Sequence, residues 1–153
     1  MHPFAPLAGD LSGTNAFRFM PTDDLVAAPS RAHVGPEAGG HGWSLRYTWV
    51  HPEDGEQDGV LLVGSPADDG EVTAALMDSW HQKPAPATLT GAFSDGLLVL
   101  SMSYAGDWGW QIVVGPDGDA LGMTMSNVVP AGVEGAEPGP YDVMVARWEP
   151  VAG

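Results

Sequence analysis

Residues 74–81 carry two ionisable side chains among apolar neighbours. The stretch reads Ala-Ala-Leu-Met-Asp-Ser-Trp-His, which places Asp78 three positions before His81. A carboxylate in an otherwise hydrophobic strand needs a hydrogen-bonding or charged partner, because without one it takes up a proton. A histidine can serve as a general base or as a metal ligand near neutral pH. We therefore take Asp78 and His81 as the first candidates for a functional site.

Asp78 shares strand parity with Leu76 and Trp80, so its carboxylate lies inside the fold if that face of the strand points inward. The available partners are two arginines and three tyrosines: Arg46, Arg147, Tyr47, Tyr104 and Tyr141. Two interpretations remain open. The carboxylate is either a polar anchor that orients a ligand in an apolar cavity, or part of a structural salt bridge or of the rim.

His81 is followed by Gln82, Lys83 and Pro84, and a strand ends near such a proline. We expect His81 at the mouth of the fold, on the face opposite Asp78 if the strand continues, as an acid–base group or as a solvated side chain. The other histidines lack metal-ligand spacing, and the chain has neither cysteine nor a Gly-x-Ser-x-Gly pattern. The sequence therefore predicts no catalytic residue, no metal site and no cofactor.

About ten short β-type runs must position these residues, and glycine, proline or aspartate marks almost every junction. In residues 43–50, aromatic and apolar side chains alternate with polar ones, which is typical of a strand with one buried face. The other expected strands are 13–20, 30–34, 60–63, 71–80, 87–93, 97–104, 108–114, 121–128 and 141–148. The helical candidate is a short turn at 22–28.

Hairpins that follow one another in chain order favour an antiparallel up-and-down β-barrel over a two-sheet sandwich, which has similar strand spacing. We predict an all-β chain of about ten strands with at most one short helix, forming a single domain over residues 1–153. A barrel of this size holds one small ligand.

We expect apolar contacts to that ligand from Trp43, Tyr47, Trp49, Met77, Trp80, Trp110, Met123 and Met125, with Asp78, Arg46 and His81 as polar contacts. The methionines equally suit an ordinary core. Strand parity stays open, because a slip of one residue exchanges the inner and outer sets.

The excess of acidic over basic residues disfavours some classes of binding partner. Twenty acidic residues against five basic ones give a net charge of -15, which disfavours binding to nucleic acid and to anionic membrane surfaces. No apolar run is long enough to span a bilayer, and the first residues lack a secretory-signal pattern. Together with the absence of cysteine, these features predict a cytoplasmic protein, with its oligomeric state left open.

Several segments resemble the calycin superfamily of β-barrels. Residues 7–14, Leu-Ala-Gly-Asp-Leu-Ser-Gly-Thr, resemble the Gly-x-Trp-x-Gly element that opens the first strand of those barrels. Residues 43–49, 59–64 and 76–80, followed by Gly91, resemble a bacterial family of small calycin-like domains. The resemblance implies a lipocalin-like or fatty-acid-binding-like barrel of about ten strands that binds something small and apolar.

Two departures from the calycin pattern matter. Leu11 occupies the position where calycins usually have tryptophan, while Arg147 remains on the last strand, where it is expected to cover the closed end. The haem-binding calycins called nitrobindins carry a histidine ligand late in the chain, and this sequence has no histidine after His81.

Our main functional hypothesis is the non-catalytic binding of a small hydrophobic molecule inside the barrel. Three alternatives remain open. They are an enzyme that uses Asp78 or His81 as an acid or base in the same cavity, a haem protein ligated through His81, and a module that binds a partner through an exposed sheet edge or aromatic patch.

Overall fold

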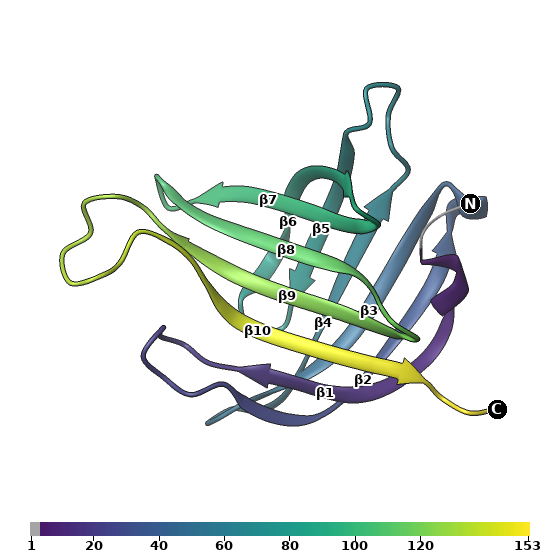
Figure 1. Ribbon diagram of the computed structural model, residues 1–153, viewed down its shortest axis with the longest axis horizontal. Helices are drawn as coiled ribbons and strands as arrows, with labels where there is room; N and C mark the ends of the chain where they lie inside the picture. The colour runs from purple at the N-terminus through teal and green to yellow at the C-terminus, as the bar shows by residue number, and fades with distance from the viewer. Residues whose placement is uncertain (1–3) are drawn as a thin grey trace.

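The computed structural model describes residues 4–153, which form a closed antiparallel β-barrel (Figure 1). Its ten strands are β1 Gly9–Phe17, β2 Val26–Glu37, β3 Gly42–His51, β4 Gly55–Gly64, β5 Val72–Asp78, β6 Gln82–Ser94, β7 Leu97–Tyr104, β8 Trp108–Asp117, β9 Ala120–Val129 and β10 Gly139–Pro150. Two short 3-10 turns, η1 Ala5–Leu7 and η2 Ala38–Gly40, accompany them. The predicted all-β barrel is confirmed, and the sandwich is excluded because the sheet closes on itself.

The strands follow one another around the barrel in chain order, and the first strand pairs with the last. The closing ladder between β1 and β10 runs from Leu11 opposite Pro150 to Phe17 opposite Met144. Gly13 permits the close approach of these strands, since a Cβ there would lie 2.0 Å from a carbonyl oxygen of β10. Figure 1 shows the purple β1 alongside the yellow β10, where the barrel closes.

Alternate residues of each strand point into the barrel and form its core. On β3 the inward positions are Trp43, Leu45, Tyr47 and Trp49, all of them buried. On β5 they are Val72, Ala74, Leu76 and Asp78. One continuous cluster of buried apolar side chains involves every strand of the sheet. Much of the interior is therefore packed side chain rather than open lumen.

The two ends of the barrel differ. The N-terminal segment covers one end, where Phe4 and Leu7 are buried and the Phe4 ring lies 6.2 Å from that of Phe93. Only about 10 Å³ of space remains beneath it. Arg147 does not cover this end, because it points outward and pairs with Asp117 and Glu149. The opposite end carries the loops β1–β2, β3–β4, β5–β6, β7–β8 and β9–β10, and the main interior cavity lies there.

Residues 22–28 do not form the expected helix. β2 begins at Val26, and residues 26–28 pair with the end of β1. A helix of under two turns is unstable on its own, whereas the ladder adds hydrogen bonds along the whole of β1. β5 ends at Asp78 instead of continuing to Trp80, which changes the position of the turn that follows. Within residues 4–153, no helix is long and apolar enough to cross a membrane.

Candidate functional site

Three residues paired across neighbouring strands form one wall of the candidate site. Tyr47 on β3 pairs with Gly59 on β4, and Gly59 pairs with Asp78 on β5. Gly59 leaves room for the tyrosine ring, since a Cβ there would lie 2.3 Å from the Tyr47 hydroxyl oxygen. The phenol therefore extends across the intervening strand and donates a hydrogen bond of 3.0 Å to Oδ2 of Asp78.

Four hydrogen-bond donors surround the Asp78 carboxylate. Oδ2 accepts the Tyr47 hydroxyl and the Trp49 indole N–H, each at 3.0 Å. Oδ1 accepts the backbone N–H of Trp80 at 2.9 Å and that of His81 at 3.1 Å. A carboxylate has about four lone-pair positions, so these bonds satisfy it without an arginine or lysine. Of the partners expected from the sequence, the structure selects Tyr47.

The environment of Asp78 keeps its carboxyl ionised. Burial raises the pKa of Asp78, but the His81 side chain and the backbone N–H groups of Trp80 and His81 outweigh it, so the pKa lies below its ordinary value. Burial, and then the adjacent Asp78 charge, raise the pKa of Tyr47 well above its ordinary value. The site thus holds a carboxylate beside a neutral phenol at neutral pH.

The turn after β5 returns His81 to the same interior as Asp78. The Asp78 side chain accepts hydrogen bonds from the backbone two and three residues later, which is the geometry of an Asx turn. Nδ1 of His81 lies 3.6 Å from Oδ1 of Asp78. Its ring stacks on Trp49, with 5.0 Å between centroids and 23° between planes. His81 lies at the mouth, as expected, but faces inward because the strand does not continue through it.

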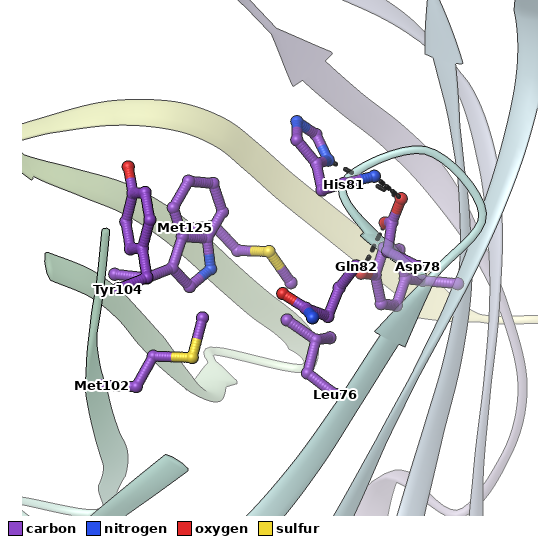
Figure 2. A pocket seen from close by; sticks show the side chains of 9 residues that line it. Leu76, Asp78, His81, Gln82, Met102, Tyr104 and Met125 are labelled. Atoms are coloured by element: carbon purple, nitrogen blue, oxygen red, sulfur yellow. Dashed lines mark hydrogen bonds and ion pairs between the residues drawn. The ribbon is translucent and has the colours of Figure 1, made fainter. Parts of the chain in front are cut away.

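Asp78 and His81 border an interior cavity of about 170 Å³. The other lining residues are Tyr47, Leu76, Gln82, Met102, Tyr104, Trp110 and Met125. Figure 2 shows Tyr104 and Met102 on one side of the cavity, with Asp78 and His81 on the other. Carbon and sulfur atoms form most of the wall, and the charged group lies at the end of β5.

Five of the residues expected to contact a ligand line this cavity: Tyr47, Asp78, His81, Trp110 and Met125. Trp49 lies behind the wall, since its indole binds Asp78 and stacks on His81. Trp80 packs beside the mouth. Trp43 lies at the closed end, and Met123 belongs to the packed core, so the structure places neither on the cavity.

Arg46 and Met77 lie on the outer face of the barrel, contrary to expectation. Each is flanked in its strand by two inward-facing residues. Because side chains alternate along a strand, both must point outward, and Met77 is 38% exposed. Neither residue can contact a ligand in the interior, and Arg46 does not accompany Asp78.

Four cavity residues were not among the expected contacts: Leu76, Gln82, Met102 and Tyr104. The alternation of inward and outward side chains along a strand could have identified three of them. Leu76 precedes Asp78 by two positions, and Met102 and Tyr104 share a face of β7. Gln82 carries no such signal, because it reaches the cavity through a turn whose geometry periodicity does not encode.

A second histidine, His51, is buried and supports the rim of the cavity. His51 is 3% exposed, and its Nδ1 accepts the backbone N–H of Glu53 at 3.1 Å and of Asp54 at 2.9 Å. Its ring stacks on Trp80 at 4.6 Å, and the Trp80 indole N–H donates to the Asp54 carboxylate. The β3–β4 and β5–β6 turns are thereby joined beside the mouth.

The fold defines a closed ten-stranded up-and-down barrel, which is consistent with a calycin-like architecture. Protein-family models and curated proteins were both compared with the chain, and none matches it. In residues 4–153, no three histidine, aspartate or glutamate side chains are grouped so that they could hold a metal ion.

Proposed function

We propose that the barrel binds a small hydrophobic molecule in the cavity beside His81 and does not transform it. The observation that carries this proposal is the 170 Å³ cavity at the open end, apolar over most of its wall and bordered by a few polar groups. Small-molecule sites commonly combine an apolar lining with a few polar groups that fix orientation. Barrels commonly offer such a site at their mouth.

The volume of the cavity limits the ligand to about one ring. A dry apolar cavity of about 150 Å³ holds benzene, whereas drug-sized ligands occupy about 300 Å³ or more. A haem group is several times larger than the space beside His81, so these residues do not fit the haem alternative.

The state of Asp78 favours binding over catalysis. Its oxygens already accept four hydrogen bonds, and its lowered pKa makes it a poor proton acceptor near neutral pH. Asp78 instead fixes the walls, because it holds Tyr47, Trp49 and the turn that carries His81. An enzymatic role would then depend on His81.

Native mass spectrometry of the freshly purified protein, beside its denatured form, tests the proposal directly. We expect extra mass on the native protein that is lost on denaturation and corresponds to a small molecule. Equal masses, together with no binding of ring-sized compounds by calorimetry, would contradict it.

Two adjacent residues provide a matched pair of variants for that experiment. Leu76→Phe fills the cavity, whereas Met77→Phe adds a similar group to the outer face of the same strand. We expect Leu76→Phe to abolish binding and Met77→Phe to leave it unchanged. Equal binding by the two variants would place the ligand outside this cavity.

A further inference from the structure

The polar groups on the cavity wall are mostly hydrogen-bond acceptors. Tyr47 gives its proton to Asp78, and Tyr104 gives its proton to Oδ1 of Asn127. The ionised Asp78 has no proton to donate. Nδ1 of His81 lies 3.6 Å from this carboxylate, and the tautomer with its proton on Nδ1 leaves Nε2 as an acceptor.

Two side chains on the wall, Gln82 and Trp110, retain a hydrogen-bond donor. Hydrogen-bond acceptors still predominate on the wall. Gln82 commits one amide N–H to the carbonyl oxygen of Ala85 at 3.2 Å and keeps both an N–H and its oxygen. Figure 2 shows its amide end directed into the cavity. The indole Nε1 of Trp110 has no hydrogen-bond partner, but surrounding atoms shield it from solvent, so it does not face the open space.

The charge at the cavity has the same sign as the protein. No lysine or arginine is among the lining residues that the structure describes, so no such cation balances the charge of Asp78. Three of the lining residues are aromatic: Tyr47, Tyr104 and Trp110. Aromatic faces attract cations, most strongly when the cation is removed from water.

The loops around the mouth extend this negative field outward. They contain one arginine, Arg18, and seven acidic residues: Asp23, Asp24, Glu53, Asp54, Asp107, Glu134 and Glu137. A mouth with a large excess of negative charge raises the local concentration of cationic ligands and repels anions.

Acceptors on the wall, an ionised carboxylate behind it and an acidic mouth all favour a ligand that donates hydrogen bonds and carries positive charge. We propose that the natural ligand is a small organic amine, bound as its ammonium ion with its apolar part against Leu76, Met102 and Met125. This inference rests on the proposed function and specifies the chemical class of its ligand.

Three compounds of nearly the same shape test which ligand charge the cavity prefers: benzylamine, benzyl alcohol and benzoate. Each carries one ring, which matches the cavity, and at neutral pH they are a cation, a neutral donor and an anion. We expect calorimetry to give benzylamine the highest affinity, about tenfold above benzyl alcohol, and no binding of benzoate. Added salt is expected to weaken benzylamine more than benzyl alcohol.

Gln82→Glu changes the charge of the wall without changing the size of the side chain. Gln82→Glu is expected to tighten benzylamine binding several-fold relative to benzyl alcohol, because it adds a negative charge to the wall. Gln111→Glu serves as the control for net charge, because Gln111 lies on β8 outside the cavity lining.

The possible outcomes distinguish a failure of the amine assignment from a failure of the proposed hydrophobic binding site. Binding of benzyl alcohol that equals or exceeds that of benzylamine overturns the amine assignment and leaves the hydrophobic site intact. Binding of benzoate overturns it as well. Failure of all three compounds to bind, with no mass lost from the native protein, overturns both proposals.

Discussion

Tyr47 reaches Asp78 across an entire strand. The two residues lie on β3 and β5, and the phenol passes over Gly59 of β4 to donate its hydrogen bond. The contact thus depends on a third residue that contributes no side chain. This relationship connects the packing of the barrel to the polar end of its cavity, and it makes the site sensitive to a change that adds one methyl group.

Gly59→Ala is expected to destabilise the protein by about 1–3 kcal/mol, because the added Cβ would displace the Tyr47 ring from a packed interior. Urea denaturation measures the change. Gly122→Ala is the matched control, since a Cβ there would meet its neighbours at ordinary contact distances. A Gly59 variant as stable as the control would show that the ring moves without cost.

Tyr47→Phe removes one of four donors to the buried Asp78 carboxylate. We expect the free energy of unfolding to fall by about 2 kcal/mol, since hydrogen bonds to charged groups contribute more than neutral ones. Tyr104→Phe is the control, because its hydroxyl lies on a side chain that is partly exposed and binds a neutral amide. Equal losses in the two variants would argue against a special role for the carboxylate.

The lowered pKa of Asp78 predicts how stability changes with pH. A carboxyl with a lower pKa in the folded state binds its proton more weakly there than in the unfolded chain, so it stabilises the fold above its ordinary pKa of 3.8. That contribution is lost as the pH falls through the folded-state value. We expect the stability difference between the wild type and Asp78→Asn to be largest at neutral pH and to shrink in acid, as measured by urea unfolding at each pH.

A stability difference that stayed constant down to about pH 2 would contradict this assignment, because it would mean that Asp78 titrates alike in both states. The nearby exposed Asp58, replaced in the same way, provides the comparison for a surface carboxylate on the adjoining strand.

His51 is expected to hold the β3–β4 turn through its Nδ1. His51→Ala removes the acceptor for two backbone N–H groups, so hydrogen exchange at the amides of Glu53 and Asp54 should accelerate about tenfold or more. Nuclear magnetic resonance resolves these amides individually. His33→Ala, on the outer face of β2, is the control and should leave the exchange rates of these amides unchanged. Slow exchange in both variants would mean that contacts other than His51 stabilise the turn.

The sequence predicts the sheet far better than it predicts the site. Aromatic alternation in residues 43–49 identifies both β3 and its inward face, because one buried side of a strand imposes a period of two. The same logic places Asp78 on one face with Leu76, and the structure shows that this face points inward. It fails for Arg46, which was chosen for its charge although its parity is opposite to that of Tyr47.

The remaining errors arise where contacts distant in the sequence outweigh local preference. Residues 22–28 contain a plausible helix start, yet pairing with β1 determines the conformation of 26–28. Gln82 enters the cavity because Asp78 ends its strand with an Asx turn, and a turn of this kind leaves no periodic pattern.

The ladder between β1 and β10 has a consequence for how the protein folds. Strands β1 to β9 can pair in succession as neighbouring hairpins, but the free edges of β1 and β9 are covered only when β10 inserts between them. Pairing residues so far apart in the chain is intrinsically slow, and exposed edges promote aggregation until it occurs. If the first nine strands pair during synthesis, the nascent chain carries two unpaired edges until its tenth strand emerges from the ribosome.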